Sequence, residues 1–147
     1  MSSEKKIDPF AVIILVLSII GIILVATQDF AGFYLGGGYY RYSCLDCEYA
    51  TGVDLAAQII ILILLIVQIV IALNDLLPNR FIEKNLDLIG LILGGLTILF
   101  TMIGLGAFGI VYGFFGDHEW WPETGFYGAI IAGILNTILF FLKFKNR

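Results

Sequence analysis

Four long stretches of the chain contain no charged side chain, and they restrict the possible folds more than any other feature. They cover residues 9–28, 55–74, 88–115 and 124–142. A helix of about 20 apolar residues is long enough to cross the hydrocarbon core of a bilayer. The chain is 60% hydrophobic and 14% charged, whereas soluble domains carry about 25% charged residues. We therefore predict an all-α membrane protein, with residues 1–147 forming a single four-helix transmembrane domain.

The third stretch is longer than one membrane crossing requires. Its 28 residues would form a helix of about 42 Å at ~1.5 Å per residue, whereas the hydrocarbon core is about 30 Å thick. We expect this helix either to tilt strongly or to project beyond the lipid.

The Lys and Arg residues are distributed unevenly among the segments that flank these stretches. Seven of the eight lie before the first stretch, between the second and third, or after the fourth, and only Arg41 lies elsewhere. Cytoplasmic segments of membrane proteins carry an excess of Lys and Arg. The pattern predicts a multi-pass protein of the plasma membrane with both termini in the cytoplasm. The seven residues are Lys5, Lys6, Arg80, Lys84, Lys143, Lys145 and Arg147.

The two remaining connections, residues 29–54 and 116–123, are rich in aromatic residues. Aromatic rings with a polar edge favour the headgroup level, so we expect both loops to lie on the outer surface of the bilayer. Aromatic, β-favouring residues on both sides of Gly36, Gly37 and Gly38 predict a short β-hairpin, and a flexible glycine loop is the alternative. The candidate contact residues on this surface are Tyr39, Tyr40, Tyr42, Trp120 and Trp121.

Cys44 and Cys47 form a C-x-x-C pair in the first outer loop, and the chain has no other cysteine. Thiols outside the cell tend to be oxidised, so we expect a structural disulfide that tightens the loop. A C-x-x-C pair can also exchange thiols, and a four-helix membrane protein with such a pair before its second helix resembles the DsbB family. That resemblance implies a membrane thiol–disulfide oxidoreductase. Acidic neighbours raise the pKa of a thiol, so Asp46 and Glu48 favour the structural role.

A zinc site is a third interpretation of the outer loops. His118, with Asp117 or Glu119, is predicted on the same side of the membrane as the two cysteines, and such ligands suit tetrahedral zinc. The spacing carries no metal-binding signature, and we predict neither a metal nor another cofactor. Nucleic acid is not an expected partner, because the chain has no basic stripe.

Small residues recur four positions apart in the third and fourth stretches. This spacing lets two helix backbones approach closely, and it predicts tight contacts between these helices, within the bundle or between copies. The polar residues inside the stretches are not ionisable, which argues against an ion-coupled carrier; we expect Gln68 and Asn136 to hydrogen-bond across helices. The small residues are Gly90, Gly94, Gly109, Gly113, Gly125, Ala129 and Gly133.

The predicted organisation, with a larger first outer loop, a smaller second one and a long third helix, resembles the claudin and PMP22 superfamily and, more loosely, MARVEL proteins. In claudins the first loop is a small β-sheet with one disulfide, and the third helix extends past the membrane; residues 30–47 and the end of the 88–115 stretch occupy those places. We expect a non-enzymatic membrane scaffold, or a small accessory subunit of a membrane complex, that presents its aromatic, disulfide-tied outer surface to a partner. Its partners would be the lipid bilayer, further copies of itself or other membrane proteins.

Overall fold

The computed structural model describes residues 4–146, and four long helices make up most of that range. They are α1 (Pro9–Thr27), α2 (Val53–Leu76), α3 (Asp87–Gly109) and α4 (Thr124–Lys145). The π-helical turn η1 (Ile110–Phe115) continues α3, so that the two form one rod of 29 residues. All four helices are long and apolar enough to cross a membrane, so the four predicted long apolar helices are present.

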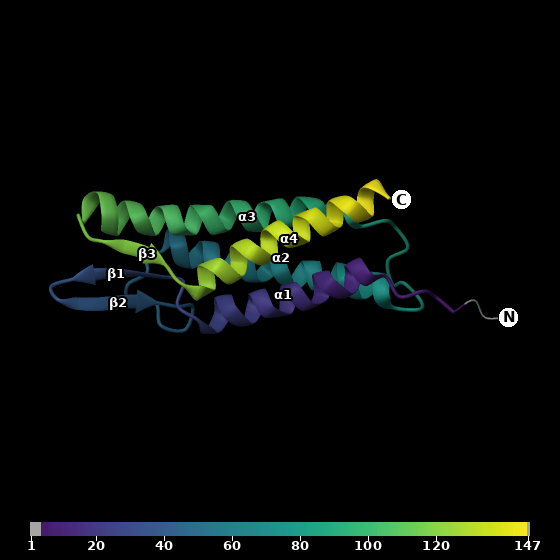
Figure 1. The fold of residues 1–147 in the computed structure, drawn as a ribbon, viewed down its shortest axis with the longest axis horizontal. Coiled ribbons are helices and arrows are strands. Elements are labelled where there is room, and N and C mark those ends of the chain that lie inside the picture. Colours follow the sequence, from purple (N-terminus) through teal and green to yellow (C-terminus); the bar gives the residue numbers. More distant parts are fainter. Residues whose placement is uncertain (1–3, 147) are drawn as a thin grey trace.

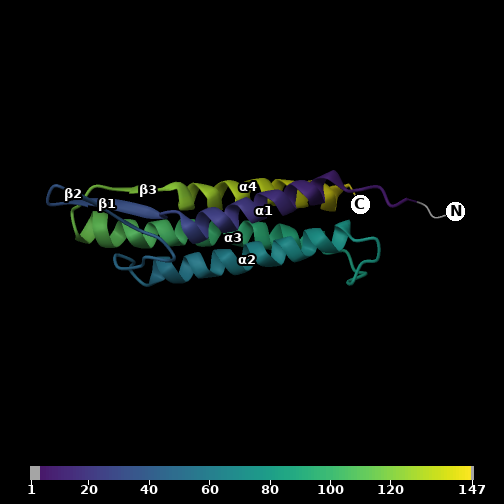
Figure 2. The same ribbon diagram turned by 90° about the horizontal axis from the view of Figure 1, so that it is seen from below.

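The four helices form a bundle in which each helix packs against two others. α1 and α3 both contact α2 and α4, and consecutive helices run in opposite directions (Figure 1). Figure 2 shows two layers, with α1 and α4 in one layer and α2 and α3 in the other. Both described chain ends and the α2–α3 connection therefore lie at one end of the bundle, opposite the strands.

The predicted hairpin is present, and the alternative of a flexible glycine loop is wrong. β1 (Ala31–Leu35) pairs with β2 (Gly38–Tyr42) in antiparallel register. Gly36 and Gly37 form the turn with φ values of +58° and +87°. Two successive residues with positive φ are typical of a type I′ hairpin turn, and glycine adopts this conformation without steric cost.

A third strand corrects the prediction that residues 116–123 form a plain loop. β3 (Trp120–Pro122) pairs with the free edge of β1, which gives the strand order β2-β1-β3. Three residues are too short to give a period-two pattern in the sequence. The strand forms because β1, about 90 positions earlier in the chain, supplies its hydrogen-bond partners.

One face of the sheet is buried against the end of the α3–η1 rod. Phe33 of β1 stacks on Tyr112 with 4.0 Å between ring centroids, and Tyr42 of β2 stacks on Phe108 at 5.0 Å. Phe30 and Phe126 complete this aromatic core. We call β1, β2, β3 and η1 together the cap; its aromatic core fixes its position relative to the helices.

Large apolar side chains remain exposed along the length of the helices. Ile20, Ile63, Ile92 and Ile131 are each about half exposed. Soluble proteins rarely expose apolar surface of this extent. The surface fits a multi-pass membrane protein whose helices face lipid tails.

Candidate functional site

The five aromatic residues predicted as a contact surface are divided between the two faces of the sheet. Tyr39 is 70% exposed, and Trp121 lies beside it with 5.7 Å between ring centroids. Tyr40 stacks on Phe33 on the buried face. Trp120 is only partly exposed, because its indole covers the outer end of α3.

Tyr42 corrects the predicted surface, because its side chain is fully buried. It pairs with Ala31 on the face of the sheet that packs against α3. Burial raises the pKa of Tyr42, and the negative charge of Asp54 raises it further. The ring therefore belongs to the core beneath the cap, with its hydroxyl protonated at neutral pH.

Cys44 and Cys47 are free thiols, so the structure does not support the predicted disulfide. The Cys44 thiol is directed into the protein, where Sγ donates a hydrogen bond to Oε1 of Gln58 at 2.7 Å, while Cys47 is exposed. Burial raises the pKa of Cys44, and the proximity of Cys47 adds to the shift. A thiol held in this state is a poor nucleophile at neutral pH.

The suggested zinc ligands are not gathered at one point. The His118 ring lies against Phe33, with 5.9 Å between centroids. Within residues 4–146, no three His, Cys, Asp or Glu side chains are grouped so that they could hold a metal ion.

Three of the predicted small residues lie at the contact between α3 and α4. A Cβ atom on Gly90 would overlap the buried ring of Phe140, and one on Gly94 would lie 3.1 Å from the backbone N and Cα of Thr137. Across the same contact, a Cβ on Gly133 would approach Thr97 at 3.2 Å. These glycines allow the two backbones to lie close together.

The other small residues serve different contacts from the predicted one. Gly109 and Gly113 face the indole of Trp120, so they make room for the cap rather than for α4. Gly125 lies against the backbone carbonyls at the end of α1, where a Cβ atom would lie 3.0 Å from the Asp29 carbonyl oxygen. Ala129 is fully buried in the aromatic core.

A fully buried polar network crosses the middle of the bundle, as predicted for Gln68 and Asn136. Asn136 Nδ2 donates to Gln68 Oε1 at 2.8 Å and to Ser18 Oγ at 2.9 Å. Gln68 Nε2 donates in turn to Thr97 Oγ1 at 2.9 Å. Each helix contributes one side chain, so the network specifies which helix faces meet in the apolar interior.

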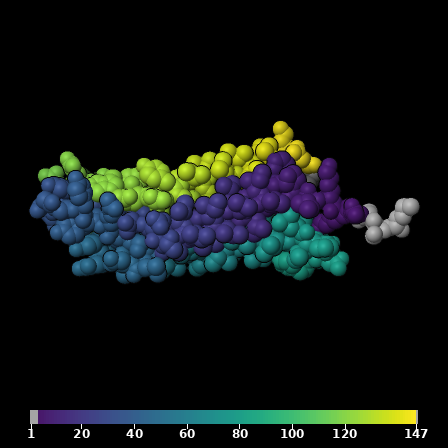
Figure 3. Space-filling view, turned by 60° about the horizontal axis from the view of Figure 1, so that its bottom comes forward, coloured from purple at the N-terminus to yellow at the C-terminus, as the bar shows by residue number. Residues whose placement is uncertain are grey.

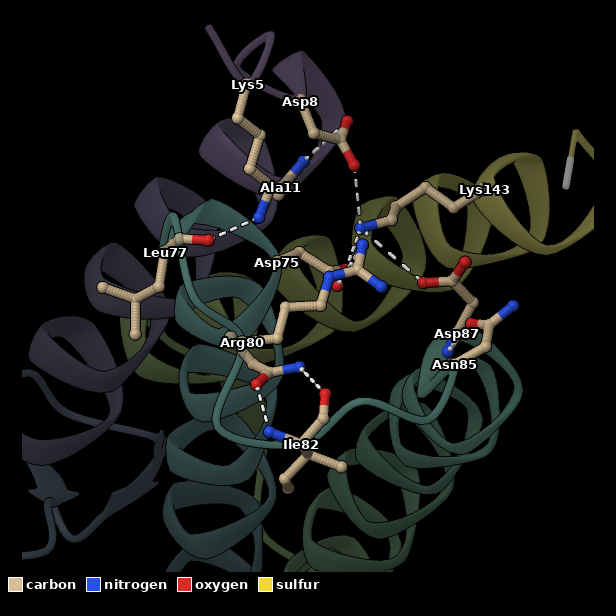
Figure 4. A network of polar contacts seen from close by, with 11 residues as sticks. Lys5, Asp8, Ala11, Asp75, Leu77, Arg80, Ile82, Asn85, Asp87 and Lys143 are labelled. Carbon is tan, nitrogen blue, oxygen red and sulfur yellow. Dashed lines mark hydrogen bonds and ion pairs between the residues drawn. The ribbon is translucent and has the colours of Figure 1, made fainter. Parts of the chain in front are cut away.

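At the end of the bundle away from the cap, Lys143 is surrounded by carboxylates. Its side chain is only 2% exposed. Nζ forms ion pairs with Asp75, with Asp8 at 3.0 Å and with Asp87 at 3.6 Å. Arg80 approaches Asp75 from the α2–α3 connection at 3.4 Å. Figure 4 shows these side chains converging, and we call the five residues the Lys143 cluster.

The Lys143 cluster joins the ends of all four helices. Asp8 caps α1 by accepting hydrogen bonds from Phe10 N and Ala11 N. Burial raises the pKa of Asp8, but the hydrogen bond and charge of Lys143 outweigh this effect, so the pKa lies below its ordinary value of 3.8. Asp75, Asp87 and Lys143 belong to α2, α3 and α4.

This cluster was not predicted from the sequence, because its residues lie at the flanks of the uncharged stretches. The helices begin or end one to three residues beyond the uncharged stretches, so Asp75, Asp87 and Lys143 become helical and buried. The sequence does contain a signal for the cluster: each uncharged stretch has an Asp or Lys directly at the end that is predicted to be cytoplasmic. Such boundaries in an antiparallel bundle lie at the same level.

The arrangement holds the four helices together and presents an ordered cap at one end of the bundle. Side chains from all four helices bind one another in the buried network around Asn136, and carboxylates pair with Lys143 at the helix ends. Comparison of the chain with family models, with curated proteins and with solved structures gave no match.

Proposed function

We propose that this chain is a non-enzymatic membrane scaffold, or a small accessory subunit of a membrane complex, that presents its cap to a second protein. The proposed location is the plasma membrane, with both termini cytoplasmic and the cap outside. The partner is another membrane protein or a further copy of the chain. The organisation that resembles claudin and PMP22 proteins supports a contact role of this kind.

The observation that carries the proposal is a pair of exposed phenylalanines at the tip of the α3–η1 rod. Phe114 is 80% exposed and Phe115 is 76% exposed, and the two rings touch edge to face. A rod of 29 residues is about 43 Å long at ~1.5 Å per residue, which exceeds a hydrocarbon core of about 30 Å. We expect the two rings to lie beyond the lipid tails, where exposed apolar side chains mark contact sites.

The rigidity of the cap supports the same proposal. Its strands are paired with one another, its turn is fixed by two glycines, and its inner face is stacked on α3 through Tyr42 and Phe108. A surface that is already ordered loses little conformational entropy when a partner binds.

The alternative, a DsbB-like oxidoreductase using Cys44 and Cys47, has less support. Catalysis by thiol exchange requires a thiolate, and the burial of Cys44 raises the pKa of its thiol. The hydrogen bond to Gln58 has the thiol as donor and favours the protonated form.

Replacing both phenylalanines should weaken the proposed contact. We expect the Phe114→Ser/Phe115→Ser variant, purified from cell membranes in mild detergent, to retain its partner or further copies at least roughly 30-fold less well, the loss typical of interface hot spots. Mass measurement of the complexes gives the result. Phe81→Ser is the matched control, because Phe81 is also exposed but lies in the α2–α3 connection at the opposite end. A wild-type chain that is monomeric and alone in every membrane extract would contradict the proposal.

The proposed orientation has a separate test. Single cysteines placed at Lys5, Lys84 or Lys145, in a Cys44→Ser/Cys47→Ser background, should resist an impermeant thiol reagent in intact cells and react after the cells are opened. A cysteine at Tyr39 should react in intact cells, because this exposed side chain lies on the cap. Rapid labelling at Lys84 together with protection at Tyr39 would reverse the orientation.

A further inference from the structure

A narrow apolar groove runs between α1 and α4 in the half of the bundle next to the cap. It has a volume of about 320 Å³ and is lined by Leu17, Ile20, Gly21, Leu24, Thr124, Tyr127, Gly128, Ile131 and Ala132. Gly21 and Gly128 have no side chain that would fill the groove, and α1 and α4 approach closely at these two residues. Figure 3 shows α1, in purple, and α4, in green to yellow, side by side along this face.

A charged pair lies at the cap end of the groove. Glu123 directly precedes Thr124, which lines the groove. Oε1 of Glu123 accepts a hydrogen bond from Trp121 Nε1 at 2.6 Å and lies 3.3 Å from Nε of Arg41. Arg41 and Trp121 both pair with Gly32 in the sheet, so they occupy neighbouring positions on its outward face, and Gly32 leaves room between them.

This outward face of the sheet is continuous with the face that carries the groove. The opposite face of the sheet packs on α3 and η1. Figure 2 shows the strands in the same layer as α1 and α4, on the side away from α2 and α3. A molecule lying in the groove with its polar end at Thr124 would therefore meet Arg41, Glu123 and Trp121.

We propose that this site binds one phospholipid that carries both a phosphate and an ammonium group, from the membrane leaflet next to the cap. One acyl chain lies in the groove, the phosphate meets the Arg41 guanidinium, and the ammonium meets the Glu123 carboxylate. The rings of Trp121 and Tyr39 add a cation–π surface for the ammonium. The inference rests on the proposed membrane insertion, but it does not depend on the orientation or on a protein partner.

The dimensions of the groove favour an acyl chain over a helix from a second protein. The lining extends from Leu17 to Leu24 on α1, about 10 Å at ~1.5 Å per residue. A volume of 320 Å³ over that length corresponds to a cross-section of about 32 Å², whereas a helix of 10 Å diameter occupies about 79 Å². A single unbranched hydrocarbon chain is thin enough to enter.

The charges select the headgroup. Arg41 alone would favour any phosphate, and Glu123 beside it would repel a headgroup whose net charge is negative. A zwitterionic headgroup places one charge opposite each side chain. The site therefore discriminates against phosphatidylglycerol and in favour of phosphatidylcholine.

Native mass spectrometry can test the proposal on the full chain in nanodiscs that contain equal amounts of phosphatidylcholine and phosphatidylglycerol. We expect the wild type to retain a single phosphatidylcholine after gentle release. Ile20→Trp, which places a bulky ring in the groove, should lower that occupancy about tenfold, the effect of one large lost contact. Ile23→Trp is the matched control, since Ile23 is equally lipid-exposed on α1 but does not line the groove.

The headgroup contacts have their own variants. Arg41→Gln should lower occupancy about tenfold, the effect of losing a charge-assisted hydrogen bond, and Glu123→Gln should abolish the preference for phosphatidylcholine. Lys84→Gln, at the opposite end of the bundle, should change neither. Equal lipid retention by Ile20→Trp and Ile23→Trp would overturn the proposal, as would a wild type that prefers phosphatidylglycerol. A dimer that Ile20→Trp dissociates would assign the groove to a second copy instead.

Failure of the lipid proposal can be distinguished from failure of the proposed scaffold function. Loss of partner contact at Phe114 and Phe115 would leave the lipid result unchanged, because nanodiscs contain no partner. A chain that does not enter nanodiscs at all would overturn both proposals.

Discussion

Replacing Lys143 with Met should destabilise the bundle by about 3–5 kcal/mol, the cost of removing one partner from a buried ion pair. The ammonium group of Lys143 forms ion pairs with Asp8, Asp75 and Asp87, and the Lys143 side chain is 2% exposed. Methionine has a similar length and no charge, so it removes the ion pairs without creating a large void. Thermal unfolding of the purified protein in mild detergent, followed by circular dichroism, measures the effect.

Lys145→Met is the matched control for this prediction, because Lys145 lies one half-turn further along α4 and is exposed. We expect its unfolding midpoint to equal that of the wild type. Adding Asp75→Asn to Lys143→Met should recover part of the lost stability, because it removes a buried carboxylate that has lost its ion pair with Lys143. The importance of the Lys143 cluster is disproved if the Lys143 and Lys145 variants unfold at the same temperature.

The second large effect is expected at Gly94, where even one methyl group has no room. A Cβ atom there would lie 2.5 Å from Thr137 Oγ1 and 3.1 Å from the Thr137 backbone. The backbone cannot rotate away as a side chain can, so α3 and α4 must separate. We expect Gly94→Ala to cost about 1–3 kcal/mol, the usual penalty for overpacking a core.

The neighbouring glycine supplies an internal control. A Cβ atom on Gly95 would meet nothing within 4 Å, and alanine favours a helix over glycine by about 0.5–1 kcal/mol. Gly95→Ala should therefore leave the unfolding midpoint unchanged or raise it. Equal midpoints for the two alanine variants would show that the α3–α4 contact has more freedom than this packing allows.

Local pattern was sufficient for the parts of the fold that depend on local forces. Uncharged runs of about 20 residues identify membrane-crossing helices because lipid offers no partner to an unpaired backbone group or a charge. The turn at Gly36 and Gly37 could be predicted for a similar reason, since two successive positive φ values strongly favour glycine. The hydrogen bond between Gln68 and Asn136 follows from the shortage of other partners in an apolar interior.

The candidate site was harder to predict because its members come from distant parts of the chain. Trp121 and Tyr42 have the same aromatic character in the sequence, yet Trp121 lies on the outward face of the sheet, opposite Gly32, and Tyr42 is buried on the other face. The face of the sheet on which each ring lies depends on strand register: Tyr42 pairs with Ala31, on the face that packs against α3. A shift by one residue would reverse the two faces of a strand, and the turn geometry together with the aromatic core selects one register.

The sequence by itself determined four apolar helices, their antiparallel order and a glycine hairpin, because each follows from hydrophobicity or backbone sterics within a short segment. Only the tertiary structure decided that residues 120–122 become a strand, that Gly109 and Gly113 receive an indole rather than a helix, and that Lys143 meets three carboxylates. Those contacts join residues up to 135 positions apart (Asp8 and Lys143). Their energies arise from burial and charge pairing once the helices are packed, which no local pattern encodes.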